Sequence, residues 1–103
     1  MKREIKSIVT DDTHHCYIHK KFLGIEVNAD HEHHMIHGEN RKIADEHHLV
    51  CGLCESCHRL LHDMGYHDLD LQQDAERAWL EYNNKSIRDW VAVFGKNYLN
   101  EHW

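Results

Sequence analysis

The chain has 103 residues, which fits one domain with a small hydrophobic core. It has no apolar run near the roughly 18 residues that a membrane span needs, and its charged first residues, 1–5, lack the apolar segment of a signal peptide. The formal net charge of −6 argues against a broad basic surface for nucleic acid. We therefore expect a cytoplasmic protein.

Cysteine and histidine are the unusual part of the composition, with 4 cysteines and 13 histidines. Disulfides are rare in a reducing compartment, so the cysteines are better interpreted as metal ligands than as bridges. The histidines are dispersed along the chain, and several stand beside cysteines or acids. This distribution indicates metal chemistry.

The first part of the chain favours short strands. Residues 4–10 carry β-branched side chains in loose alternation, which predicts a short strand followed by a turn at 11–13. Farther along, the alternating residues 25–27 and a turn at 28–30 predict a β-hairpin within residues 23–35. Its second strand carries His33 and His34.

The middle of the chain predicts two short helices. Residues 38–40 break the pattern, and Asn40 is a suitable N-cap for a helix over 41–47. A short apolar piece follows at 49–53. A second helix is expected to begin at Ser56 or Cys57 and to end near Gly65.

Two amphipathic helices are predicted in the last third. Apolar residues recur at three-to-four spacing over 69–83, as in a helix with one buried face. Ser86 and Asp89 form a capping box ahead of Trp90 and Phe94, and Gly95 is a suitable stop. The region at about 68–99 is therefore expected to be a helical support for the part before it.

Two short pairs have the spacing of a structural zinc site. A two-residue gap lets both side chains of a tight turn reach one ion, and two such pairs complete a tetrahedron. The pairs are Cys16 with His19 and Cys54 with Cys57. Cys51 could replace one of these ligands, and His14 or His15 could replace His19.

Four other histidines suggest a second centre. His58 and His62 are four residues apart, so on a helix they share one face, as helical metal ligands do. On a strand, His33 and His34 point to opposite sides. One of these two can therefore bind an ion while the other faces a substrate, as a metal-dependent hydrolase with a general base requires.

These residues resemble the HNH endonuclease motif, also called the ββα-metal or His-Me finger motif. The resemblance is carried by the doublet before Met35, the segment 53–58 and His62, with a spacing similar to that of the nuclease colicins. The cysteine pairs resemble those of zinc-ribbon HNH enzymes of bacteria and phages. Residues 38–42 and 94–99 resemble small phage and prophage HNH-type proteins, so the likeness covers about 16–99.

The resemblance implies an α+β fold in one domain, 1–103. A small zinc-stabilised ββα-metal core at about 14–67, with a short β-hairpin, would be followed by two or three C-terminal helices. His34 would be the general base, and the catalytic ion would be held by His33, His58 and His62. His67 is a second candidate for the third ligand. The residue that braces the base would be His48, or His47 if the register shifts by one.

The implied activity is metal-dependent hydrolysis of DNA phosphodiester bonds, in phage or prophage DNA processing or recombination inside a bacterial host cell. An all-histidine ligand set favours zinc, nickel or manganese over magnesium. Arg41 and Lys42 are candidate phosphate contacts, within a local basic patch that also includes Lys20, Lys21 and Arg59. The alternative is a catalytically silent zinc module that binds nucleic acid or protein. Phage recombination or replication proteins are candidate partners, and the apolar C-terminal helices could support a homodimer.

Overall fold

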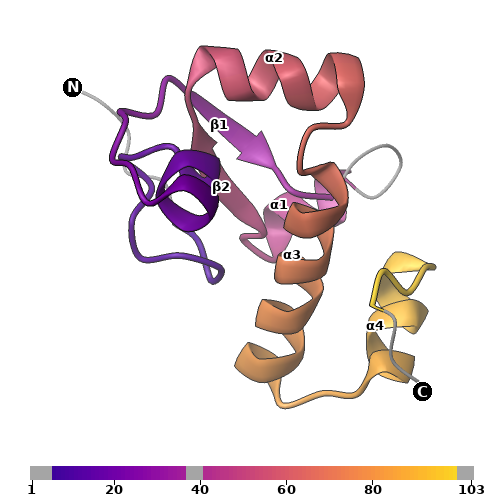
Figure 1. The fold of residues 1–103 in the computed structure, drawn as a ribbon. Coiled ribbons are helices and arrows are strands. Elements are labelled where there is room, and N and C mark those ends of the chain that lie inside the picture. Colours follow the sequence, from indigo (N-terminus) through magenta and orange to yellow (C-terminus); the bar gives the residue numbers. More distant parts are fainter. Residues whose placement is uncertain (1–5, 37–40, 100–103) are drawn as a thin grey trace.

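In the part of the chain that the structure describes, the protein is a small α+β molecule in which two strands form one antiparallel sheet, covered by helices and loops. The computed structural model describes residues 6–36 and 41–99, with only the backbone of Arg41 (Figure 1). The elements in chain order are the π-helix η1 (His19–Leu23), β1 (His31–His34), α1 (Arg41–Glu46), β2 (Val50–Leu53), α2 (Glu55–Met64), α3 (Asp68–Asn83) and α4 (Ile87–Phe94). Within the described part of the chain, every helix is too short or too polar to pass through a lipid bilayer.

The pairing of β1 differs from the predicted hairpin. β1 pairs with β2, with His33 opposite Cys51 and His34 opposite Val50. Residues 25–27 form no strand, although the Cys16 amide donates to the Val27 carbonyl at 2.6 Å. The predicted hairpin is wrong because all four residues of β2 are buried, so pairing there places β1 against the core.

The N-terminal segment is also not the predicted strand. Residues 6–10 have no strand conformation, and residues 4–5 lie outside the described part. The Ser7 hydroxyl donates to the Val50 carbonyl at 2.6 Å and accepts the Val9 amide at 3.0 Å, which turns the chain locally. The Ile8 amide donates to the His48 carbonyl at 3.1 Å. The segment is therefore attached to β2 and the turn before it.

The loop after this segment crosses β2 at Gly52. A Cβ atom on Gly52 would lie 2.4 Å from the Thr13 carbonyl oxygen and 2.7 Å from the Ala29 Cβ. Both distances are too short for a side chain, so only glycine allows this approach. One face of the sheet is thereby covered by the residues before β1.

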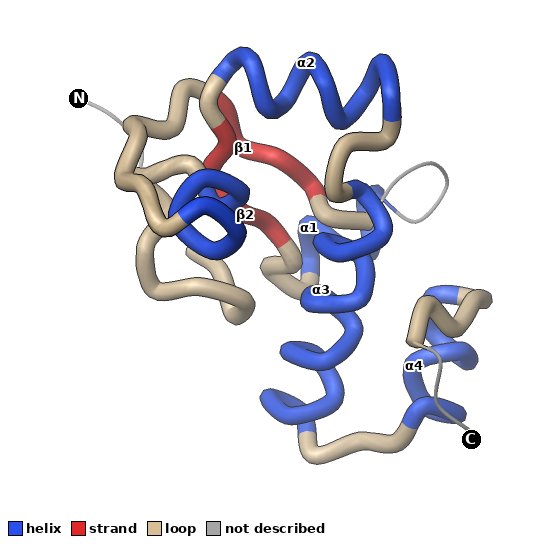
Figure 2. The backbone as a smooth tube through the Cα atoms, viewed as in Figure 1, coloured by secondary structure: helices blue, strands red, loops and turns tan. Residues whose placement is uncertain are grey.

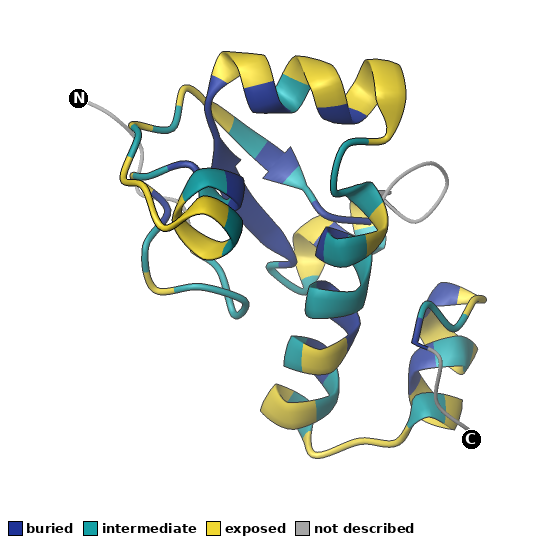
Figure 3. Ribbon diagram, viewed as in Figure 1, coloured by how far each residue is buried: buried dark blue, intermediate teal, exposed yellow. Residues whose placement is uncertain are grey.

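Helix α2 lies across the sheet and covers its other face (Figures 1 and 2). Its buried residues are Cys57 and Leu61, and its outer side is exposed (Figure 3). The helix begins at Glu55, slightly earlier than predicted, with Cys54 as the N-cap. The Asp30 carboxylate accepts the Glu55 amide at 3.0 Å, which satisfies a donor of the first turn from outside the helix.

The two last helices agree with their predicted positions. α3 begins at Asp68 and ends at Asn83, and α4 has the predicted capping box at Ser86. The Trp90 and Phe94 rings of α4 stack with centroids 3.9 Å apart, and Trp79 of α3 packs edge-on against Trp90 at 5.6 Å. These contacts join the two helices by aromatic packing.

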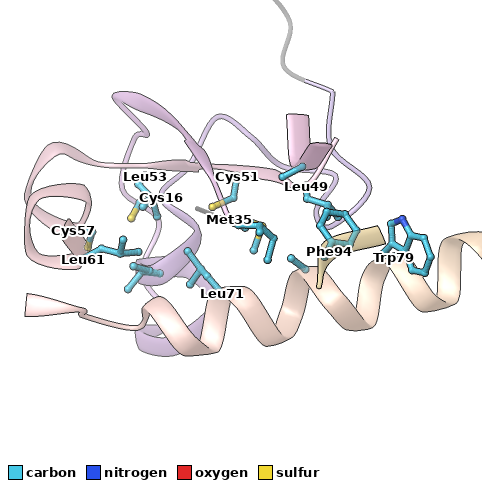
Figure 4. Packing of buried hydrophobic residues seen from close by; sticks show 14 of the residues in the cluster. Cys16, Met35, Leu49, Cys51, Leu53, Cys57, Leu61, Leu71, Trp79 and Phe94 are labelled. Carbon is cyan, nitrogen blue, oxygen red and sulfur yellow. The ribbon is translucent and has the colours of Figure 1, made fainter. Parts of the chain in front are cut away.

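One apolar cluster connects the sheet region with the C-terminal helices. Figure 4 shows Cys16 and Cys57 at one end of this cluster, Met35 and Leu71 between, and Trp79 and Phe94 at the other end. Helix α1 ends at Glu46, one residue before the predicted end. Its predicted N-cap, Asn40, lies outside the described residues.

Candidate metal centres

The first candidate centre joins the N-terminal loop to the start of α2. The ligand atoms of its four residues all lie within 4.8 Å of one another. Three of the four are buried, with 0 to 5 % of their surface exposed. The residues are Cys16, His19, Cys54 and Cys57.

The donor distances fit a tetrahedral zinc ion. The His19 Nδ1 atom lies 3.6 Å from the Cys54 Sγ and 3.4 Å from the Cys57 Sγ. A zinc ion at ordinary metal–sulfur and metal–nitrogen lengths places two such donors about 3.5 Å apart. Thiolate and imidazole are also the donors that zinc prefers, so this group can bind zinc.

Two compact local structures present these ligands. On the N-terminal side, the Lys20 amide donates to the Cys16 carbonyl at 3.0 Å, and η1 is capped by Gly24 in the left-handed conformation with φ of 67°. On the other side, Cys54 is the N-cap of α2 and Cys57 lies in its first turn. The turn and the helix start therefore face each other across the group.

The two thiols of the second pair differ in acidity. Burial opposes ionisation of Cys54, but hydrogen bonds from the Ser56 hydroxyl and the Cys57 amide outweigh it and lower the pKa of this thiol. Burial, followed by the hydrogen bond with Cys54, raises the pKa of Cys57. The surroundings of Cys54 therefore favour its thiolate, the form in which a cysteine binds a metal ion.

The alternative ligands considered for this centre lie elsewhere. Cys51 is fully buried in β2, and burial raises the pKa of its thiol. His15 belongs to a different group, in which its Nδ1 lies 2.7 Å from Asp12. His14 is exposed, and its backbone amide donates to Asp12 at 3.0 Å. The structure thus gathers the four residues of the predicted set without these alternatives.

The second candidate centre consists of three histidines on β1 and α2. The ligand atoms of His33, His58 and His62 lie within 4.8 Å of one another, and the two Nε2 atoms on α2 are 3.0 Å apart. The His33 ring lies 5.2 Å from the His58 ring and 5.6 Å from the His62 ring, between centroids. His33 is 2 % exposed, whereas His62 is on the exposed side of the helix. The group is therefore buried on its strand side and open to solvent on its helix side.

His34 belongs to a different cluster from the three histidines. Its Nε2 atom lies 3.2 Å from the Asp45 Oδ1 of α1, and Glu32 completes this cluster. Alternation along β1 places Glu32 and His34 on the side of the strand opposite to His33. Asp45 was not among the predicted site residues, because no short spacing relates a residue of α1 to one of β1.

The two candidates for the bracing residue occupy different positions. His48 lies in the tight turn between α1 and β2 with φ of 59°, and its amide donates to the Asp45 carbonyl at 3.0 Å. The His47 Nδ1 accepts the indole N–H of Trp79 at 3.3 Å. An indole N–H can only donate, so His47 contributes an acceptor nitrogen to the contact with α3.

The remaining predicted site residues lie outside both groups. His67 precedes α3, where its Nδ1 lies 2.7 Å from Asp70 and its ring stacks on Phe22 at 4.2 Å between centroids. Lys42 is exposed on α1. The side chain of Arg41 lies outside the described part of the chain.

No protein-family model, no curated protein and no solved structure matches the chain. The structure itself establishes a small α+β protein with a cysteine and histidine group that can bind zinc.

Proposed function

We propose that the protein is a metal-dependent endonuclease of the HNH type that hydrolyses DNA phosphodiester bonds. The observation that carries this proposal is the meeting of His33 from β1 with His58 and His62 from α2 within 4.8 Å. The order β1, α1, β2, α2 supports it, since two paired strands followed by a helix are the elements of a ββα-metal core, here with the short helix α1 between the strands. Three parts of the proposal rest on the sequence resemblance alone. They are a role in phage or prophage DNA processing, a location in the bacterial cytoplasm, and recombination or replication proteins as partners.

The three histidines fit a transition-metal ion. Their nitrogen donors suit zinc, nickel or manganese better than magnesium, which prefers oxygen ligands. Such an ion would stabilise negative charge on the scissile phosphate and on the leaving 3′ oxygen. The buried His33 fixes the strand side of the group, and the exposed His62 leaves the other side accessible to a substrate.

In this proposal His34 is the general base. Its Nε2 atom lies 3.2 Å from the Asp45 carboxylate, and an ionised carboxylate can only accept a hydrogen bond. The ring proton therefore sits on Nε2, and Nδ1 is the basic nitrogen. Nδ1 takes a proton from the water that attacks phosphorus, while the bond between phosphorus and the 3′ oxygen breaks. Asp45 is a positioning residue that holds the ring in the orientation in which Nδ1 can take the proton.

The zinc-binding group has a supporting role. Cys54 and Cys57 lie at the beginning of α2, which carries His58 and His62. A zinc ion bound there would fix this end of the helix to the loop that contains Cys16. The distance between α2 and β1 would then be set partly by the zinc ion.

A second candidate is a zinc-binding module that binds a partner without cleaving it. Its supporting observation is electrostatic, because three members of the predicted basic patch are paired with acids. Lys20 lies 2.6 Å from Asp12, Arg59 lies 2.7 Å from Glu55, and Lys21 contacts Asp74. Together with a net charge of −6, this pairing reduces the attraction for a nucleic-acid backbone.

The test is cleavage of supercoiled plasmid with added manganese, nickel, zinc or magnesium. We expect wild-type protein to nick the plasmid and His34→Ala to lose about 100-fold or more of the rate, since general-base catalysis contributes about 10² to 10⁴. Asp45→Asn should lower the rate less than His34→Ala does. The rate of His48→Ala is measured in parallel, and a rate below that of wild type would indicate that this residue also supports the base.

The matched control is His14→Ala, which removes an exposed histidine from outside both candidate centres. It should cleave at the wild-type rate. Equal cleavage by wild type and His34→Ala would refute the assignment of the base. No cleavage with any of the four metals would favour the non-cleaving zinc module.

A further inference from the structure

We propose that His31 is a fourth ligand of the ion held by His33, His58 and His62, an inference that rests on the metal centre of the proposed function. Residues 31 and 33 both belong to β1. Because side chains alternate along a strand, two residues at this spacing project from the same face. This is the face that α2 covers.

The ring distances place His31 at the edge of the three-histidine group. The His31 ring lies 5.1 Å from the His58 ring, and the His33 ring lies 5.2 Å from the same ring. His58 is therefore contacted almost equally by both strand histidines. The cross-strand neighbour of His31 is Leu53, whose apolar side chain offers no hydrogen bond to the imidazole.

The difference in burial gives the two strand histidines different roles. His33 is 2 % exposed, whereas His31 is exposed. The exposed side chain can turn about its side-chain bonds to bring a nitrogen toward the other three donors. The same freedom lets it leave again when an oxygen atom of the substrate needs its position.

The resulting site has a recognisable chemistry. Two histidines at alternate positions of a strand and two histidines one helical turn apart present four imidazole nitrogens. Four nitrogen donors suit tetrahedral zinc or cobalt, and they disfavour magnesium and calcium. We therefore expect the resting site to be closed by protein ligands, with His31 as the ligand that is displaced.

The test is cobalt binding to protein whose cysteine site is already filled with zinc. Tetrahedral cobalt absorbs visible light much more strongly than six-coordinate cobalt, so the spectrum reports the coordination directly. In wild-type protein we expect one cobalt ion with a tetrahedral spectrum, whose affinity is measured by competition with a chelator. In His31→Ala the affinity should fall by at least about tenfold, and the visible absorption should weaken.

The control variant is again His14→Ala, which should bind cobalt as wild type does. Retained zinc and an unchanged far-ultraviolet circular dichroism spectrum show that each variant is folded. If wild type binds cobalt and His31→Ala gives the same affinity and spectrum, the fourth ligand is refuted and the proposed nuclease is unaffected. If wild type binds no ion beyond the zinc of the cysteine site, both the fourth ligand and the proposed catalytic centre are refuted.

Discussion

Replacing Cys57 by alanine is expected to remove the zinc ion and much of the stability of the protein. Cys57 is 3 % exposed, and its Sγ atom lies 3.4 Å from the His19 Nδ1. The group connects two parts of the chain, since His19 and Cys54 are 35 positions apart. Without one of the four donors the connection through the ion is weakened or lost.

The magnitude follows from the length of the loop that zinc closes. A cross-link that closes a loop of about 35 residues raises the free energy of the unfolded chain by about 4 kcal/mol, according to the chain-entropy relation used for disulfides. Domains of this size have free energies of unfolding of about 5–15 kcal/mol, so the loss is a large fraction of the total. With a urea dependence of about 2 kcal/mol per molar, the unfolding midpoint should fall by about 2 M.

The assay is urea unfolding followed by tryptophan fluorescence, together with measurement of bound zinc. Cys51→Ala is the matched control, because Cys51 is an equally buried cysteine outside the zinc-binding group. It should keep the wild-type zinc content and lose only the packing of one thiol. A strong chelator should bring wild type close to Cys57→Ala. If Cys57→Ala retains zinc and unfolds at the same urea concentration as Cys51→Ala, the assigned zinc ligand is wrong.

Three further predictions concern the stability of the fold. Gly52→Ala should lower the free energy of unfolding by about 1–3 kcal/mol, because the new Cβ would lie 2.4 Å from the Thr13 carbonyl oxygen. An unchanged denaturation midpoint would contradict the close approach of the Thr13 loop to β2. Ser86→Ala should lower the free energy of unfolding by about 1 kcal/mol, measured by denaturation, because α4 loses its N-cap. An unchanged free energy of unfolding would contradict the role of this cap. Hydrogen bonds from the backbone and then the side chain of Ser86 lower the pKa of Asp89 below its ordinary value of 3.8. The stabilisation is therefore present above that ordinary value and is lost as the pH falls through the lower pKa of the folded state. Asp89→Asn should lack this pH-dependent stabilisation, so its stability should fall less than that of wild type as the pH is lowered. The same loss of stability with acid in both proteins would contradict the prediction.

The helices were largely predictable because their determinants are local. The capping box at Ser86, the stop at Gly95 and the spacing of apolar residues over 69–83 all concern residues within one or two helical turns. A helix forms its hydrogen bonds within one segment, so the sequence of that segment contains most of the information. The exact start of α2 was missed because its first amide is satisfied by Asp30, which belongs to another part of the chain.

The strand pairing was not predictable by the same reasoning. The sequence favoured a local hairpin within residues 23–35, whereas β1 pairs with β2, which follows α1 in the chain. A strand obtains its hydrogen bonds from another segment, and the choice depends on which partner buries more apolar surface. That comparison requires the position of α2 and of the apolar cluster, which only the tertiary structure provides.

The sequence by itself determined which residues are candidate ligands, because pairs such as Cys54 with Cys57 and His58 with His62 are defined by short spacings. Only the tertiary structure brought His19 to the cysteines of α2, His33 to the histidines of the same helix, and Asp45 to His34. It also placed His31 beside His58. The physical reason is that ligand spacing is a property of a single turn, whereas a complete coordination group requires donors from segments that meet only when the core packs.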